Sequence, residues 1–175
     1  MDEGELTVWT LGHSSRTLDE FLELLRANGI EAIADVRRYA ASRKHPHFAG
    51  EALRGALAEI AVEYLPLPEL GGRRRPRPDS HNTAWRNESF RGYADYMETD
   101  AFRAGLARLL ELAGRRRTAV LCAEAVWWRC HRSLIADALK ARGVGVRHIL
   151  GGKRTESHPY TSAARLEDGR LSYSA

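Results

Sequence analysis

Short apolar runs alternate with amphipathic stretches along most of the chain. Runs rich in aliphatic, aromatic and β-branched residues predict strands over 6–11, 30–36, 62–67, 118–123 and 144–150. Between these runs, apolar residues recur every three or four positions, which predicts helices over about 51–61, 89–97 and 101–113 and two more that end at Asn28-Gly29 and at Gly143. The run at 118–123 is almost wholly apolar, as expected of a central strand that is buried on both faces.

The order of these elements predicts the fold class. Strands that alternate with helices form parallel sheets, because each helix carries the chain back to the start of the next strand. We therefore predict a single α/β domain over residues 1–175, with a mainly parallel, open sheet of about five strands and helices on both faces, in a Rossmann-like arrangement. Residues 68–88 are predicted to form a long basic loop, and residues 153–175 an irregular tail, because prolines and glycines interrupt the periodic patterns there.

Charge and composition narrow the class of protein. The 175 residues carry a net charge of +4, and the arginines cluster in two runs, Arg73–Arg77 and Arg115–Arg117. The first run lies in the predicted loop and could follow phosphates, whereas the second suits the end of a helix.

No stretch is apolar for the length that a membrane span requires, and the first residues are acidic where a secretory signal would be basic, so we expect a cytoplasmic protein without membrane contact. Two cysteines are too few for a disulfide framework.

Polar motifs follow the carboxyl ends of the predicted strands. Parallel sheets bind ligands at this edge, so segments that are distant in sequence are expected to meet in one cleft. A further motif, Cys130-His131-Arg132, stands where the next helix begins, and a helix N-terminus favours an anion. The motifs that follow strands are Gly12-His13-Ser14, Asp35-Val36-Arg37, Glu69-Leu70-Gly71-Gly72, Cys122-Ala123-Glu124 and Gly151-Gly152.

The same motifs resemble those of a known family. The chain is similar to the domain-of-unknown-function-488 family from about Val8 to His148. The resemblance implies a compact α/β domain, and it implies no established activity. It rests on the ordered motifs Thr10-Leu11-Gly12-His13-Ser14, Asp35-Val36-Arg37, Ser42-Arg43, Leu67-Pro68-Glu69-Leu70-Gly71-Gly72, Phe90-Arg91-Gly92-Tyr93, Cys122-Ala123-Glu124 and Cys130-His131-Arg132.

The two cysteines support different interpretations. Cys130 is a candidate nucleophile, because a helix N-terminus and the flanking cationic groups lower the pKa of a thiol; the alternative is an inert cysteine buried at a helix start. Its surroundings differ from a tyrosine-phosphatase loop, which places an arginine six residues after the cysteine where this chain has Ala136. Cys122 is predicted to belong to the core, with a rhodanese-like sulfur-transfer role as the less favoured alternative.

Histidine, carboxylate and arginine side chains complete the candidate site. His13 could act as a base oriented by Asp35 or Glu124. Arg37, Arg43 and Arg132 could clamp a phosphate or carboxylate, although Asp35 and Arg37 could equally form a structural ion pair. The candidate catalytic residues are Cys130, His13 and Glu124, and the candidate substrate-binding residues are Gly12, Ser14, Asp35, Arg37, Arg43, Glu69, Gly71, Gly72, Cys122, His131 and Arg132.

Two functions therefore compete. One is an enzyme that acts on a phosphorylated, nucleotide or nucleic-acid substrate with Cys130 and His13; the other is a non-catalytic module that binds nucleic acid with the same basic face. Aromatic residues of the 85–96 segment could stack on bases, but their spacing is also that of a helix packed on a core.

No cofactor or metal site is predicted, because the histidines and cysteines lack the spacing of known metal motifs. The expected partner is an anionic small molecule or nucleic acid, and the oligomeric state is left open.

Overall fold

A six-stranded sheet forms the centre of the protein. The computed structural model describes residues 6–40 and 44–175. The strands follow the order β3-β2-β4-β1-β5-β6, and neighbours from β3 to β5 are parallel, whereas β6 runs antiparallel to β5. Their bounds are β1 Thr7–Gly12, β2 Ala32–Asp35, β3 Glu63–Pro66, β4 Thr118–Cys122, β5 Gly145–Gly151 and β6 Arg154–Ser157. The predicted α/β class is confirmed, with a sheet that is mixed through its sixth strand.

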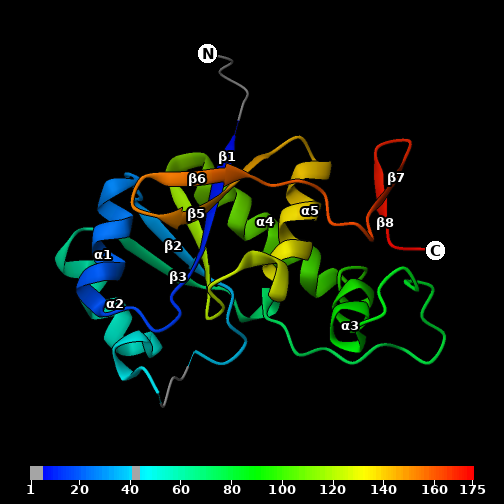
Figure 1. The fold of residues 1–175 in the computed structure, drawn as a ribbon, viewed down its shortest axis with the longest axis horizontal. Helices are drawn as coiled ribbons and strands as arrows, with labels where there is room; N and C mark the ends of the chain where they lie inside the picture. Colours follow the sequence, from blue (N-terminus) through cyan, green and yellow to red (C-terminus); the bar gives the residue numbers. More distant parts are fainter. Residues whose placement is uncertain (1–5, 41–43) are drawn as a thin grey trace.

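Helices cover both faces of this sheet (Figure 1). The helices α1 (Leu18–Ala27) and α2 (Gly50–Glu59) pack on one face, where the core includes Trp9, Leu11 and Ile33. The other face holds α3 (Glu88–Tyr96), α4 (Asp100–Arg115) and α5 (Arg132–Ala141), over a core that includes Val8, Ala34 and Val120. Because side chains alternate across a strand, the central strands contribute to both cores.

Local signals explain where the helices begin. Thr17 and Glu20 form a reciprocal capping box at the start of α1, and the Thr99 side chain accepts a hydrogen bond from the Phe102 amide at the start of α4. Each cap satisfies an amide that the helix leaves unpaired, which stabilises a helix by about 1 kcal/mol. After α1 the chain turns at Gly29, whose φ of 65° suits glycine.

The C-terminal segment differs from the predicted irregular tail. After Gly152, which has a positive φ of 56°, β6 folds back along β5. A separate two-stranded hairpin follows, formed by β7 (Arg165–Glu167) and β8 (Arg170–Ser172). Polar side chains dominate all three strands, so their hydrophobic pattern is weak. The residue after this hairpin, Tyr173, returns to the core beside α5, where its hydroxyl donates to Asp137 Oδ2 over 2.8 Å.

The order of the strands creates a cleft between β1 and β4. These two strands lie side by side, with Gly12 paired to Cys122 at their carboxyl ends. The chain leaves β1 toward α1 on one face and leaves β4 toward α5 on the other face. The two loops therefore diverge, which is the arrangement that opens a ligand crevice in parallel sheets. Short 3₁₀ helices lie nearby at Pro46–Phe48, Pro68–Leu70 and Trp127–Arg129.

Candidate functional site

The loops after β1 and β4 are joined to each other by backbone hydrogen bonds. The amides of His13 and Ser14 donate to the carbonyls of Cys122 and Ala123, each over 2.9 Å. Gly12 makes this approach possible, because a Cβ there would lie 1.5 Å from the Glu124 carbonyl oxygen. Ser14 has a φ of 52°, a strained backbone conformation for a residue with a side chain. The predicted meeting of these two motifs at one sheet edge therefore has a direct structural basis.

A cavity of about 760 Å³ opens between these loops and the segments after β2 and β3. Arginine and lysine contribute five of its described lining side chains, whereas glutamate contributes one. Positive charge around a hollow raises the local concentration of anions. The charged and imidazole side chains of the lining are Arg37, Arg38, Lys44, Arg73, Arg129, Glu124, His13, His45 and His131.

Cys130 reaches the cavity wall from the start of α5. Its Sγ lies 3.0 Å from Cys122 Sγ and 3.4 Å from the Arg132 amide nitrogen. The hydrogen bond from Cys122 lowers the pKa of the Cys130 thiol, and the charge and amide of Arg132 act in the same direction against the effect of burial. The Cys130 side chain is 7% exposed, so a small molecule in the cavity can contact it. A thiol with these properties is suited to nucleophilic chemistry.

Cys122 has the opposite electrostatic environment. It ends β4, is 1% exposed, and also has the Glu124 carbonyl oxygen 3.7 Å from its Sγ. Burial raises the pKa of Cys122 well above its ordinary value, and its contact with Cys130 adds to that effect. Of the two thiols, Cys122 therefore holds its proton more tightly, and Cys130 is the one that loses its proton first. Cys122 belongs to the core cluster and touches the cavity at the same time.

His131 offers a proton acceptor to Cys130. Its Nε2 lies 3.0 Å from the Val36 carbonyl oxygen, which can only accept, so the ring proton sits on Nε2. The other nitrogen, Nδ1, then carries a lone pair and lies 3.5 Å from Cys130 Sγ. Burial lowers the pKa of His131, so its neutral form prevails near pH 7. Cys130, His131 and the Val36 carbonyl thus form a thiol, base and orienting group in series.

His13 occupies the opposite side of the cavity. Its Nδ1 donates to the Ser14 carbonyl oxygen over 2.9 Å, and its ring stacks on Phe48 with centroids 4.4 Å apart. Burial lowers the pKa of His13, and the charges of Arg37 and His45 also lower it. The orienting group is therefore a backbone carbonyl, in place of the carboxylate of Asp35 or Glu124 expected from the sequence. The ring presents Nε2 as an acceptor.

Asp35 and Arg37 form the structural ion pair that was the alternative to a substrate clamp. Arg37 Nε and Nη2 donate to Asp35 Oδ1 and Oδ2 over 2.9 and 2.6 Å, and Tyr64 donates to Oδ2 over 2.6 Å. Asp35 is 1% exposed and lies behind the cavity lining. Arg37 lines the cavity with part of its side chain, so it contributes charge there while it remains bound to Asp35.

Arg132 holds the loop after β4. Its Nη2 donates to the carbonyls of Glu124 and Ala125 over 3.1 and 3.3 Å, and Nη1 contacts Thr10 Oγ1 at 3.4 Å. The side chain is 1% exposed and lies outside the cavity lining. The prediction of a substrate-clamping Arg132 therefore does not match this placement, because the guanidinium faces backbone carbonyls and not the cleft.

The motif after β3 reaches the cavity through one residue. Glu69 points toward α4, where its Oε2 lies 3.1 Å from Arg108 Nη1, and it does not line the cavity. Gly71 packs against Arg38, and Gly72 packs against His131, where an added Cβ would lie 2.9 Å from Nδ1. Of these three candidates, Gly72 lines the cavity. The glycines thus allow close packing of loops.

Other candidates and lining residues extend this site. Glu124 is exposed and lines the cavity. Arg43 lies outside the described residues. Arg38, Tyr39 and Arg129 line the cavity although the sequence analysis did not select them. Arg38 and Arg129 directly adjoin the motifs Asp35-Val36-Arg37 and Cys130-His131-Arg132, and this adjacency is a signal that could have identified them.

The aromatic residues of the 85–96 segment serve mainly in packing. Tyr93 is 1% exposed and donates to the Leu70 carbonyl oxygen over 2.7 Å. Tyr96 donates to the Glu69 carbonyl oxygen over 2.6 Å, and Trp85 packs on Phe90 and Tyr173. These contacts fix the loop that precedes α3 over the end of the sheet.

No group of three or more His, Cys, Asp or Glu side chains is arranged to hold a metal ion in the part of the chain that the structure describes. Over the same residues, no helix has both the length and the apolar character needed to cross a membrane.

Fold and site together define a doubly wound α/β protein with a paired-thiol cavity at the carboxyl edge of its sheet. The chain belongs to the family described as domain of unknown function DUF488, whose model matches residues 17–139. The match includes α1, both cysteines and most of α5, whereas the site residues that follow β1, among them His13 and Ser14, precede it. No curated protein and no solved structure matches the chain.

Proposed function

We propose that the protein is an enzyme that binds a phosphorylated substrate, such as a nucleotide or a nucleic-acid end, and attacks it with Cys130. The observation that supports this best is the position of the Cys130 sulfur. It has a lowered pKa and faces a cavity whose described lining has five cationic side chains and one carboxylate. A thiolate repels anions in water, so a surplus of cations is what an anionic substrate needs to approach it.

The proposed first step is displacement at phosphorus. His131 Nδ1 takes the proton of the Cys130 thiol, and the resulting thiolate attacks the phosphorus atom. An S–P bond forms as the bond between phosphorus and the leaving oxygen breaks, and that oxygen receives the proton from His131. Arginine and lysine side chains of the lining neutralise the charge that develops on the other phosphoryl oxygens.

The second step releases the phosphoryl group to water. His13 Nε2 and the Glu124 carboxylate, both on the cavity wall, are candidates to remove a proton from the attacking water. The water oxygen then bonds to phosphorus, and the S–P bond breaks to restore the Cys130 thiolate. The proton removed from water then passes to the Cys130 thiolate, which returns the site to its starting state with inorganic phosphate as the product.

The proposal is tested by measuring phosphate release and binding in parallel. The probes are nucleoside monophosphates and a short single-stranded oligonucleotide with a 5′-phosphate. Cys130→Ser is expected to abolish phosphate release and leave binding intact. Arg129→Gln, which removes a cation from the cavity wall, is expected to weaken binding about tenfold. Arg103→Gln is the matched control, because Arg103 lies on α4 outside the cavity lining.

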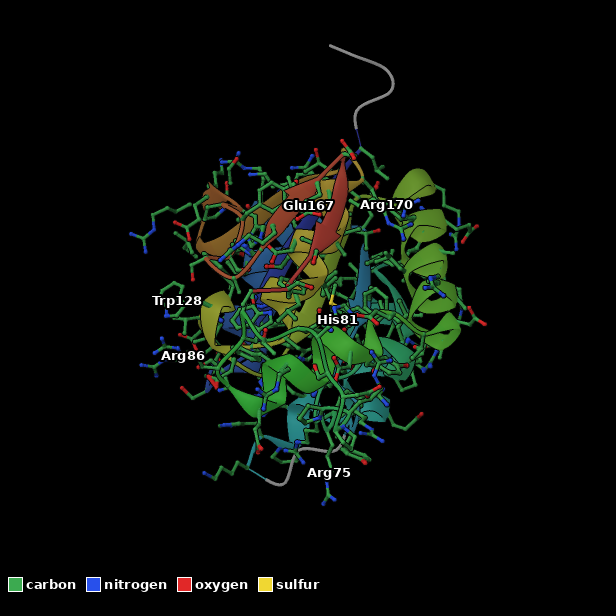
Figure 2. The ribbon with its side chains drawn as sticks, turned by 90° about the vertical axis from the view of Figure 1, so that its right-hand side faces the viewer. Arg75, His81, Arg86, Trp128, Glu167 and Arg170 are labelled. Carbon is green, nitrogen blue, oxygen red and sulfur yellow. The ribbon has the colours of Figure 1, made fainter. Side chains whose placement is uncertain are left out.

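The competing function is a nucleic-acid-binding module without catalysis. The exposed arginine run beside the cavity favours it, since Arg75 points into solvent (Figure 2) and Arg73 lines the cavity rim. Oligonucleotide binding that falls steeply with salt and is unaffected by Cys130→Ser, together with no phosphate release from any probe, would establish this module and refute the enzyme.

A further inference from the structure

The two cysteines have properties that nucleophilic attack on a phosphoryl group does not require. A single thiolate is sufficient for that reaction, yet a second thiol lies 3.0 Å from the first. The pair is brought together from two elements, because Cys122 ends β4 and Cys130 precedes α5 by two residues. The backbone holds both sulfurs at the wall of one cavity.

The distance between the two sulfurs favours disulfide closure. A disulfide bond is about 2.05 Å long, so the two sulfurs must approach each other by only about 1 Å. Cys122 and Cys130 are both free and buried, and Cys130 is the more exposed of the two. An incoming reagent therefore meets Cys130 first, with Cys122 directly behind it.

We propose that Cys122 and Cys130 form a thiol–disulfide exchange couple that reacts with small anionic disulfides entering the cavity. The cationic lining favours a disulfide that carries carboxylates over an uncharged one. The closed disulfide removes the Cys130 nucleophile, so exchange also switches the proposed enzyme off, and small thiols restore it.

The electrons and protons of this exchange balance in two steps. The Cys130 thiolate attacks one sulfur of the small disulfide, and the broken S–S bond releases one small thiolate. That thiolate takes the proton of Cys122, whose sulfur then attacks Cys130 Sγ in the mixed disulfide and expels the second small thiolate. The second small thiolate takes the proton that Cys130 gave to His131 when its thiolate formed. The protein thus loses two electrons and two protons to the reagent, which leaves as two thiols.

The difference in pKa between the two thiols and their contact determine which cysteine reacts first. The attacking sulfur is the one with the lowered pKa, since exchange rates follow the fraction of thiolate. Cys122 holds its proton more tightly, but it is already in contact with the sulfur it must attack. Proximity of this kind makes the second step intramolecular, which offsets the lower reactivity of Cys122.

The test uses glutathione disulfide as the anionic probe and 2-hydroxyethyl disulfide as the uncharged one, with intact-mass measurement after acid quenching. Wild-type protein is expected to lose two hydrogens and to accumulate little mixed disulfide. Cys122→Ser and Cys122→Ala are expected to stop at the mixed disulfide. Cys130→Ser is expected to react at least about tenfold more slowly than wild type. The charged probe is expected to react faster at low salt.

Two results would overturn the exchange couple. One is a wild-type mixed disulfide as long-lived as that of the Cys122 variants, and the other is a Cys130→Ser protein that reacts as fast as wild type. Urea unfolding of each variant establishes that the protein is folded during the assay. Phosphate release by Cys122→Ser separates the two proposals. If release continues while exchange fails, the proposed enzyme still stands. If exchange proceeds as expected but no protein releases phosphate, the exchange couple still stands and the enzyme is refuted.

Discussion

The protein has two clusters of polar side chains beside α5, and they differ in how their hydrogen-bonding capacity is used. The first is the cavity wall around Cys130. The second is a buried histidine chain, which we define as Arg132, Thr10, His148, His158 and Asp137. Every member of this chain is at most 2% exposed. Both clusters contain neutral histidines, so residue type alone does not distinguish a reactive site from a structural one.

The hydrogen bonds of the buried histidine chain from Thr10 to Asp137 run in one consistent direction, whereas Arg132 keeps one buried donor, Nε, without a partner among the described residues. Asp137 Oδ1 accepts from His158 Nε2 over 2.8 Å, so His158 Nδ1 is left to accept from His148 Nε2, also over 2.8 Å. His148 Nδ1 then accepts from the Thr10 hydroxyl. By contrast, Cys130 and His13 belong to the lining of the cavity. The candidate reactive cluster therefore differs from the structural one in that its histidine and cysteine line a cavity.

The largest expected effect is loss of the carboxylate that ends the buried histidine chain. Asp137 accepts hydrogen bonds from His158, Thr161 and Tyr173. Asp137→Ala leaves these buried donors unpaired, and we expect it to lower the free energy of unfolding by at least about 3 kcal/mol. Urea unfolding measures this loss, and the isosteric Asp137→Asn, which keeps an acceptor oxygen, is expected to lose less.

The same variant tests whether the two clusters are independent. At a urea concentration where Asp137→Ala remains folded, alkylation of Cys130 is expected to proceed near the wild-type rate. A loss of stability below about 1 kcal/mol would mean that the chain contributes little more than an ordinary surface contact. A strong drop in alkylation of the folded variant would contradict the separation of a structural and a reactive cluster.

The next effect concerns the cavity. The hydrogen bond from Cys122 is the largest cause of the lowered pKa of Cys130, so Cys122→Ala is expected to raise that pKa. A rise of one pKa unit slows alkylation about tenfold at a pH below the pKa. The rate at which iodoacetamide alkylates Cys130, followed between about pH 5 and 9, measures this pKa. Cys122→Ser keeps a hydrogen-bond donor, so we expect its Cys130 pKa to stay closer to that of wild type. Equal pH profiles for wild type, Cys122→Ala and Cys122→Ser would exclude the Cys122 donor as the cause of the lowered pKa.

Much of the fold could be predicted because its signals are local. The capping box at Thr17 and the cap at Thr99 mark helix starts directly, and the all-apolar run before Cys122 identifies a buried central strand. The C-terminal hairpin was missed although Asp168-Gly169 between Leu166 and Leu171 is a strong signal for a two-residue turn. Its strands are three residues long and mainly polar, so they contain no apolar run that would predict a strand.

The candidate site could be predicted only to the level of motifs. The edge of the sheet at which the motifs meet follows from strand order, and it brought His13, Cys122 and Cys130 together. The direction of each side chain does not follow from the motif. Arg132 turns toward the Glu124 carbonyl and Glu69 turns toward Arg108, because those partners come from other elements of the fold. Sequence spacing carries no information about them.

A smaller effect concerns how the free energy of unfolding depends on pH. Burial lowers the pKa of His148 to about 2, and the charges of His158 and Arg132 contribute to this. An unfolded histidine takes up a proton below about pH 6.5, whereas the folded His148 does not, so the free energy of unfolding falls as the pH falls below that value. His13 and His131 act in the same direction, since burial lowers the pKa of each.

The contribution of His148 can be isolated by substitution. His148→Gln is expected to reduce the slope of unfolding free energy against pH, between about pH 6 and 4, by up to roughly 1 kcal/mol per pH unit. Urea unfolding at several pH values measures the slope. His81→Gln is the matched control, because the side chain of His81 is 54% exposed. If both variants keep the wild-type slope, the buried histidine chain is not the source of acid sensitivity.

The smallest effect probes the contact between Gly72 and His131. A Cβ at Gly72 would lie 2.9 Å from His131 Nδ1, the atom that faces Cys130, so Gly72→Ala must displace the imidazole. We expect phosphate release to fall severalfold with little change in unfolding free energy, because the ring lies at a cavity and can move into it. Gly55→Ala on α2 has nothing within 4 Å of the added Cβ and serves as the control. Unchanged release in Gly72→Ala, together with a shifted His131 signal in NMR spectra, would show that the position of Nδ1 does not limit the reaction.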